Sequence, residues 1–222
     1  NYFALVERWP EFFDKLLNSV IITLGATALT IVTTTVAGYV YARHRNNFLT
    51  YSAFFMIVIR MVPPIVITIP LFPALNYFAL NDTHFLLILL YATFFVSLST
   101  WIMKAFIDQI PREMEEAAFV DGATLFQTLT RITLPLAVQG IIASAVFVFI
   151  FSWNEFLFAF IFTANKAKTA PIIISEMQSA VTGVEWGPLF AAATIQVVPI
   201  LIFVLLVQRY LIAGITAGST KG

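Results

Sequence analysis

The sequence predicts an all-α protein, a polytopic bundle of transmembrane helices that carries one segment of different composition. Of its 222 residues, 60% are hydrophobic and 11% are charged, which is far from the averages of soluble domains. The apolar residues gather in five long runs, and about 20 residues of helix cross a hydrocarbon core of about 30 Å. Because the runs are uniformly apolar rather than alternating, helices are favoured over barrel strands.

The predicted spans are Ser19–Ala42, Leu49–Leu75, Phe85–Ile107, Leu136–Thr163 and Leu189–Ile212. They leave an outer segment at residues 1–17, a cytoplasmic segment at 108–135 and an outer loop at 164–187, all parts of one predicted domain, 1–222. The sequence begins at Asn1 and shows no signal peptide. Five spans that start outside the cell would fit a six-span pattern whose first span is absent.

The distribution of basic residues predicts the orientation, because cytoplasmic loops carry an excess of Lys and Arg. One side of the predicted bundle carries seven basic residues, Arg43, Arg45, Lys104, Arg112, Arg131, Arg209 and Lys221. The other side carries four, Arg8, Lys15, Lys166 and Lys168. We therefore expect an external N-terminus, a cytoplasmic C-terminus and a cytoplasmic segment 108–135.

Several classes of function are disfavoured by what the sequence lacks. Without cysteine it forms no disulfide and no thiolate metal site, and we expect no metal site. Twelve basic against twelve acidic residues leave no footprint for nucleic acid. His44 and His84 lie at opposite ends of the spans, as an interfacial anchor and a helix start, and no P-loop or catalytic His or Ser motif occurs. The expected protein is not an enzyme.

The stretch EEAAFVDGATLFQTLTRITLPLA, from Glu115 to Ala137, differs from the apolar runs around it. It could be an amphipathic loop lying at the lipid interface. Interfacial helices on anionic membranes usually display Lys or Arg, whereas this stretch opens with two carboxylates. Ala117 and Ala118 would let another backbone approach closely, so we favour a surface for a protein partner.

Local signals in and before this stretch predict a helix, a glycine turn and a second helix. Pro111 suits the first turn of a helix, since its missing N–H would lack a partner there, and the glutamates that follow complement the helix dipole. Gly122 can adopt the left-handed conformation that ends a helix. Thr124 and Gln127 have the spacing of a capping box, and the second helix is expected to end at Leu134-Pro135.

The same residues resemble a known family. Glu116-Ala117-Ala118, Gly122, Ile132 and Leu134-Pro135 resemble the EAA loop of membrane permease subunits in binding-protein-dependent ATP-binding-cassette importers. The stretches RMVPP, NDTHFLLIL, IPREMEEAAFVDGA and SWNEFLFAF resemble the carbohydrate-importing branch. The C-terminal QRYLIAGITAGSTKG is similar to the end of the smaller permease subunit of maltose-type importers. The resemblance covers about Asn18–Gly222.

The resemblance implies that the EAA loop forms a coupling helix, which fits a groove on an ATPase subunit and transmits ATPase closure to the spans. The implied docking residues are Glu115, Glu116, Ala117, Ala118, Asp121, Gly122, Ala123, Ile132, Leu134 and Pro135. The implied partners are a second permease subunit, two ATPase subunits, an extracytoplasmic solute-binding protein, a sugar and the lipid of a prokaryotic inner membrane. ATP and Mg would bind the ATPase subunits, and no cofactor would bind this chain.

Polar residues inside the predicted spans are candidates for a translocation pathway or gate. Arg60 lies about 16 Å into its span at 1.5 Å per residue, beside Pro63 and Pro64. It could satisfy carbonyls that the prolines leave unbonded, it could anchor a neighbouring subunit, or it could contact a sugar. Asn154 and Glu155 could line the pathway by hydrogen bonding to sugar, or they could be a packing pair in an aromatic belt.

Two other functions remain open on the sequence alone. A self-contained secondary transporter or channel would drive flux from this chain without a partner, and a membrane scaffold would carry no flux. The outer loop 164–187 could fold over the pore mouth and meet the binding protein, or it could pack only against neighbouring spans.

Overall fold

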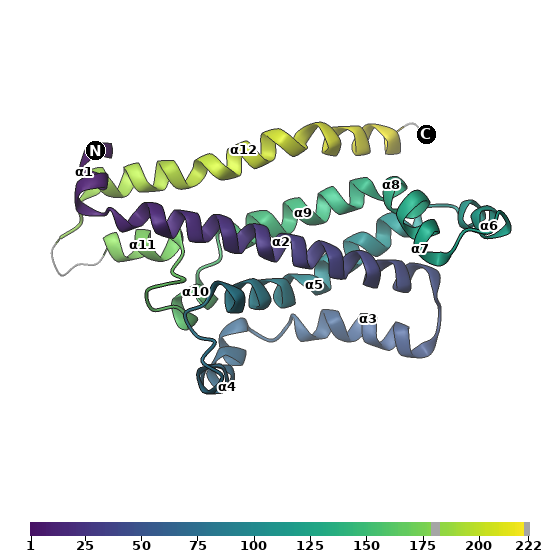
Figure 1. The fold of residues 1–222 in the computed structure, drawn as a ribbon, viewed down its shortest axis with the longest axis horizontal. Helices are drawn as coiled ribbons and strands as arrows, with labels where there is room; N and C mark the ends of the chain where they lie inside the picture. Colours follow the sequence, from purple (N-terminus) through teal and green to yellow (C-terminus); the bar gives the residue numbers. More distant parts are fainter. Residues whose placement is uncertain (179–182, 220–222) are drawn as a thin grey trace. The chain divides into compact units, whose positions relative to one another are not determined.

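The structure, a computed structural model, describes residues 1–178 and 183–219, with side chains described as far as Gln208. Figure 1 shows the helices in chain order. They are α1 (Tyr2–Arg8), α2 (Glu11–Arg43), α3 (Asn47–Ile59), α4 (Pro64–Tyr77), α5 (His84–Asp108), α6 (Arg112–Val120), α7 (Leu125–Thr128), the π-helix η1 (Leu129–Thr133), α8 (Leu134–Leu136), α9 (Val138–Trp153), α10 (Leu157–Phe162), α11 (Ala170–Met177) and α12 (Trp186–Ser219). These ranges contain no strand, and the predicted all-α class is confirmed.

Three helices, α2, α5 and α12 as far as Gln208, are long and apolar enough to cross a membrane by themselves. The number rises to five when two bent pairs each count as one span, namely α3 with α4, and Leu125–Leu136 with α9. The second predicted span, Leu49–Leu75, is therefore not one straight helix. It breaks before α4 because Pro63 and Pro64 lack the N–H groups that would continue the ladder of α3.

The fourth predicted span, Leu136–Thr163, does not form one helix either. Helix α9 ends at Trp153, and α10 begins at Leu157. The carboxylate of Glu155 accepts hydrogen bonds from the N–H groups of Phe158 at 2.8 Å and Ala159 at 3.3 Å. These N–H groups belong to the first turn of a helix, where backbone partners are absent. A carboxylate placed to satisfy them favours a new helix over continuation of the old one.

The described chain contains two compact units, one formed by residues 1–27, 62–93 and 148–206 and the other by 28–61, 94–147 and the chain from 207. In the first unit, buried side chains of α1, α2, α11 and α12 form a core that includes Leu5, Phe12, Ile173, Met177 and Leu189. Burial of these large apolar groups stabilises the unit. That the chain is a single domain stays a prediction.

The predicted outer loop 164–187 includes the helix α11 and is tied down before that helix begins. The carboxylate of Asp82 accepts four backbone N–H bonds, from Ala164 at 3.1 Å and from Asn165, Lys166 and Ala167 at 3.0 Å each. Burial raises the pKa of Asp82, but these four bonds outweigh burial and hold the pKa below its ordinary value. The loop is thus anchored to the turn before α5.

Asn18 of α2 also holds this loop. Its amide nitrogen donates to the carbonyl oxygens of Lys166 at 2.7 Å and Lys168 at 2.9 Å. Its oxygen lies 2.7 Å from Nε2 of His84. Because the Asn18 nitrogen is the donor to both carbonyls, its oxygen is the acceptor and Nε2 of His84 carries the hydrogen. His84 is the first residue of α5, as predicted.

In the second unit, α2 and α5 approach each other closely where Gly38 faces Met103. A Cβ atom on Gly38 would lie 2.7 Å from Cβ of Met103 and 3.1 Å from the backbone nitrogen of Lys104. Small residues at such crossings allow the backbones of membrane helices to pack tightly. Met103 and its buried neighbours Tyr39, Ala42, Ile107, Ile110 and Ala137 form the core of this unit.

Candidate coupling segment

The segment from Arg112 to Leu136 folds as the predicted helix, glycine turn and second helix. Helix α6 is followed by Gly122 at φ 84°, and α7 starts with the capping box of Thr124 and Gln127. The Gln127 side chain accepts from the Thr124 N–H at 2.8 Å, and the Gln127 N–H donates to the Thr124 hydroxyl at 3.3 Å. These local predictions are confirmed.

The second helix differs from prediction in its last turns. After α7 the chain forms the π-helix η1 and then α8, which ends at Leu136, one residue beyond the predicted end at Leu134-Pro135. The bend of 73° to α9 follows at Ala137. A π-helical turn carries one more residue than an α-turn, and such turns are frequent at functional sites.

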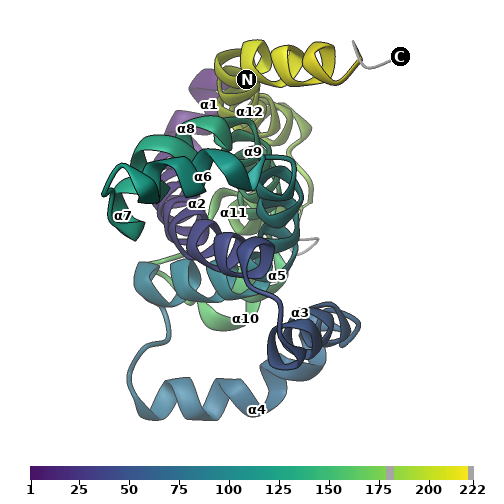
Figure 2. The ribbon, with the colours of Figure 1, turned by 90° about the vertical axis from the view of Figure 1, so that its right-hand side faces the viewer.

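A buried ion pair fastens α6 to α2. Figures 1 and 2 show α6, α7 and α8 grouped at the end of α2. Oε1 of Glu115 lies 3.0 Å from Nε and 2.9 Å from Nη2 of Arg43, the last residue of α2. The Tyr39 hydroxyl donates to Oε2 at 3.1 Å, and the Thr133 hydroxyl donates to Oε1 at 2.8 Å. Glu115 thus joins α2, α6 and η1.

The environment of Glu115 keeps this carboxylate ionised. Only 4% of the residue is exposed, and burial, the largest influence, raises its pKa. Hydrogen bonds from Arg43 and Thr133, the charge of Arg43 and the Tyr39 hydroxyl act in the opposite direction and prevail, so the pKa lies below its ordinary value. The carboxylate is therefore negative at physiological pH and matches the charge of Arg43.

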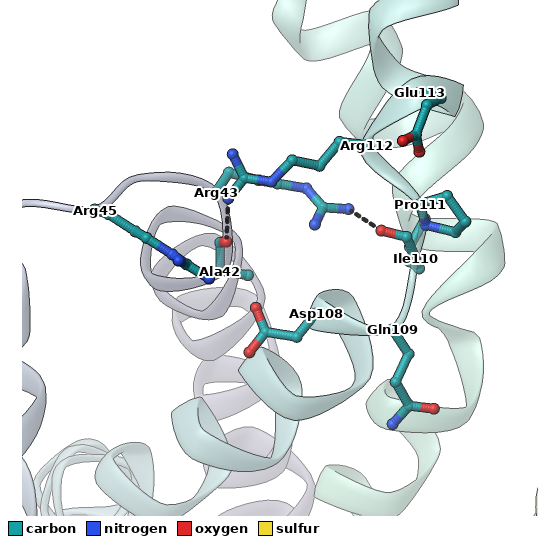
Figure 3. A pocket seen from close by; sticks show the side chains of 9 residues that line it. All are labelled: Ala42, Arg43, Arg45, Asp108, Gln109, Ile110, Pro111, Arg112 and Glu113. Carbon is teal, nitrogen blue, oxygen red and sulfur yellow. Dashed lines mark hydrogen bonds between the residues drawn. The ribbon is translucent and has the colours of Figure 1, made fainter.

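Two further bonds hold the turn between α5 and α6 against the end of α2. Figure 3 shows both, beside a cavity of about 490 Å³. Nη2 of Arg43 donates to the carbonyl oxygen of Ile110 at 3.1 Å, and Nη2 of Arg112 donates to the carbonyl oxygen of Ala42 at 3.2 Å. Arg43 of α2 thus bonds to the turn before α6, and Arg112, the first residue of α6, bonds back to α2. Together with the Glu115 ion pair, these bonds fix both the start and the middle of α6 to α2.

The structure separates the predicted docking residues into an inner and an outer set. Glu115 and Ala118 are buried within the chain, so neither presents its side chain to a partner here. The exposed ones are Glu116, Ala117, Asp121, Gly122 and Pro135, and the half-buried ones are Ala123, Ile132 and Leu134. Glu115 and Ala118 stand three residues apart and so share one helix face, while Glu116 lies about 100° around the helix.

Sequence reasoning missed a group of exposed apolar side chains, which we name the tip patch: Met114, Phe119, Val120, Leu125 and Phe126. Val120 is 88% exposed and Phe126 is 73% exposed. All five lie on α6 and α7, the helices that flank Gly122. Exposed apolar groups gathered on a firmly held segment are typical of a surface that contacts a protein or a membrane. Acidic Glu116 and Asp121 are exposed on the same segment.

Arg60 lies at the end of α3, where the helix breaks. Its guanidinium carbon is 5.4 Å from the centre of the Phe94 ring, a cation–π contact. In the residues that the structure describes, the guanidinium donates no hydrogen bond to the carbonyls of Ile59 or Arg60, contrary to one expectation. A contact with sugar stays a prediction.

Asn154 and Glu155 lie in the gap between α9 and α10. Both bond within the chain, because the Asn154 amide donates to the carbonyl oxygen of Ile150 at 2.8 Å and Glu155 caps α10. A role in the pathway or gate stays a prediction for both residues.

The amino-acid sequence of this chain is similar to those of known transport proteins. Residues 30–217 match the family described as "Binding-protein-dependent transport system inner membrane component". The chain is 34% identical over 224 residues to the trehalose/maltose transport system permease protein MalG of Thermococcus litoralis, covering 100% of this chain and 81% of that protein. It is 37% identical over 220 residues to the trehalose transport system permease protein SugB of Mycobacterium tuberculosis, covering 97% and 79%.

A solved structure has the same fold. It is described as the crystal structure of a bacterial ABC transporter involved in the import of the acidic polysaccharide alginate. The likeness has a TM-score of 0.77 and covers 90% of this chain and 75% of that chain. The sequence identity is 18%, so this likeness concerns the fold alone.

Proposed function

Because this chain belongs to the family of inner membrane components of binding-protein-dependent transport systems, we propose that it is a permease subunit of an ATP-driven carbohydrate importer. Its spans form half of the pathway, and α6 with α7 docks it onto an ATPase subunit. The carbohydrate class is supported by the two relatives, which are named for trehalose or for trehalose and maltose.

The observation that carries the docking proposal is the tip patch on a segment whose inner face is bonded to α2. A coupling element needs an outer face that binds a partner and an inner face that is firmly bonded to the rest of the chain. Val120 and Phe126 supply apolar area on the outer face. The ion pair of Glu115 with Arg43 holds the inner face against α2. Displacement of α6 by a closing ATPase is therefore passed to α2 and, through Thr133, to η1.

The remaining parts of the importer follow from the resemblance. A second permease subunit completes the pathway, two ATPase subunits bind ATP and Mg, and a solute-binding protein delivers sugar on the outer side. The C-terminus and α6 lie in the cytoplasm of a prokaryote. A self-contained secondary transporter or channel is not favoured, since the matched family consists of components of binding-protein-dependent systems.

The test is co-purification of an ATPase subunit with this chain from membranes that contain the whole importer. We expect Val120→Asp and Phe126→Asp to lose the ATPase subunit, because a charge in a docked apolar patch loses its hydration. Phe3→Asp, at an equally exposed apolar residue of α1, is the matched control and should retain it. Retention of the ATPase subunit by the two tip-patch variants would refute docking through this surface.

A further inference from the structure

A second cavity lies where α3 turns back beside α2 and next to the last turns of α5. It has a volume of about 260 Å³ and is lined by both charged and aromatic side chains. His44 and Arg45 come from the turn after α2, and Lys104 comes from α5. The helix α3 begins two residues after Arg45. This cavity lies outside the Glu115 network and outside the tip patch.

The charge around this cavity is positive. Lys104 forms an ion pair with Asp108, one turn later on α5, and the side chain of Arg45 is exposed. Arg45 and Lys104 together therefore exceed Asp108 by one positive charge. Neighbouring Arg43 does not contribute to this excess, because Glu115 balances it.

The aromatic lining of this cavity is suited to the boundary between water and hydrocarbon. Tyr41 and Trp101 line it, and these residue types concentrate at the headgroup level of membranes. The Tyr41 hydroxyl lies 3.0 Å from the Ser52 hydroxyl, which fixes α3 beside α2. Further along α3, Phe54 and Phe55 are exposed and offer an apolar surface for acyl chains.

We propose that this cavity binds the headgroup of an anionic phospholipid. The phosphate lies between Arg45 and Lys104, the glycerol region packs against Trp101, and the acyl chains run along α3. Basic pockets between membrane helices are suited to anionic headgroups. A zwitterionic lipid fits less well, because its own cation meets the positive excess. The proposal requires only that α2, α3 and α5 lie in a bilayer, and it does not depend on which solute is carried.

The test uses brominated lipids, which quench tryptophan fluorescence on contact. The assembled importer is reconstituted in vesicles of phosphatidylcholine that contain a fraction of brominated phosphatidylglycerol or brominated phosphatidylcholine. The chain has four tryptophans, so the difference between the wild type and Trp101→Phe isolates the quenching of Trp101. We expect a severalfold preference for phosphatidylglycerol, about fivefold per basic residue near the headgroup.

Variants decide whether the preference arises in this cavity. Arg45→Gln alone, at an exposed side chain, removes the positive excess and should bring the preference close to one without disturbing the fold. Arg45→Gln with Lys104→Gln should bring it below one, because Asp108 then lacks its basic partner. Arg131→Gln with Lys166→Gln removes two exposed charges elsewhere and should leave the preference unchanged.

Four outcomes would overturn the proposal. The first two are equal quenching by both lipids in the wild type and an unchanged preference in the Arg45 variants. The third is relief of quenching by inorganic phosphate in the buffer, which would identify a site for free phosphate anions instead of lipid. A Trp101 that neither lipid quenches would show that a protein chain covers the cavity, and this outcome also overturns the proposal.

Discussion

Breaking the ion pair of Glu115 and Arg43 should destabilise the junction of α2 and α6 far more than an exposed pair would. Their side chains are only 6% and 8% exposed, so loss of either partner leaves a charge buried without compensation. Such a loss typically costs about 3 to 5 kcal/mol. We therefore expect Arg43→Met to cost about 3 to 5 kcal/mol. Glu115→Gln should cost about 3 kcal/mol, since the glutamine oxygen can still accept from one of the Tyr39 and Thr133 hydroxyls and its NH2 can donate to the other.

The double variant removes both charges and tests the assignment. Replacing a buried pair by uncharged groups of similar volume is often nearly neutral. Glu115→Gln with Arg43→Met should therefore cost less than either single change, apart from about 1 kcal/mol for the lost bond to Ile110. The free energy of unfolding, measured with denaturant in mixed micelles, gives the coupling of the two sites as a double-mutant cycle.

The pH dependence of the single variants adds a second readout. In the wild type the lowered pKa of Glu115 gives stability that is present above its unfolded pKa and is lost as the pH falls through the folded pKa. In Arg43→Met, burial acts without the opposing arginine, so the pKa rises and stability should decline as the pH rises above about 4.5. Additive costs in the cycle, or a cost below about 1 kcal/mol for each single change, would refute the reasoning.

Three smaller perturbations address the turn, the helix crossing and the outer loop. Gly122 has φ 84° and open space around its missing Cβ, so backbone strain alone limits a substitution there. Gly122→Val should cost about 1 to 2 kcal/mol of stability and should slow coupled ATP hydrolysis more than Gly122→Asn does. Equal effects of the two variants would contradict this. Gly38→Val should collide with Met103 and lower stability by about 1 to 3 kcal/mol in a thermal melt, and an unchanged melt would contradict close packing. Asp82→Asn keeps one acceptor oxygen for four N–H groups, so hydrogen exchange of those amides should accelerate. In the wild type the same protection should be lost only as the pH falls through the lowered pKa of Asp82, below the ordinary range of an aspartate. Acid-insensitive protection would contradict the assignment.

The local part of the coupling segment could be predicted from the sequence because its causes lie within a few residues. Gly122 needs only its own backbone freedom, and Thr124 finds Gln127 three positions away. The all-α class followed from composition for a similar reason, since long apolar runs leave helices as the simplest spanning structure. In each case the residues that give the sequence pattern are the same residues that form the structure it predicts.

The remaining features depend on partners that are distant in sequence. Glu115 stands 72 residues from Arg43, and no spacing rule connects a carboxylate with an arginine at the end of an earlier helix. Its neighbour Glu116 has the same chemistry but stays exposed. The break before α10 was missed for a different reason, because the apolar run conceals that Glu155 can cap a new helix.

The most direct measurement is a site-specific cross-link from Val120, made possible because the chain contains no cysteine. Val120→Cys in the assembled importer should cross-link to the ATPase subunit through a short bifunctional reagent and should react with a membrane-impermeant thiol reagent only from the cytoplasmic side. Phe3→Cys should give no such cross-link and should react from the outside. A Val120→Cys that is labelled from the outer side, or that cross-links to no ATPase subunit in an active importer, would contradict the proposed coupling surface.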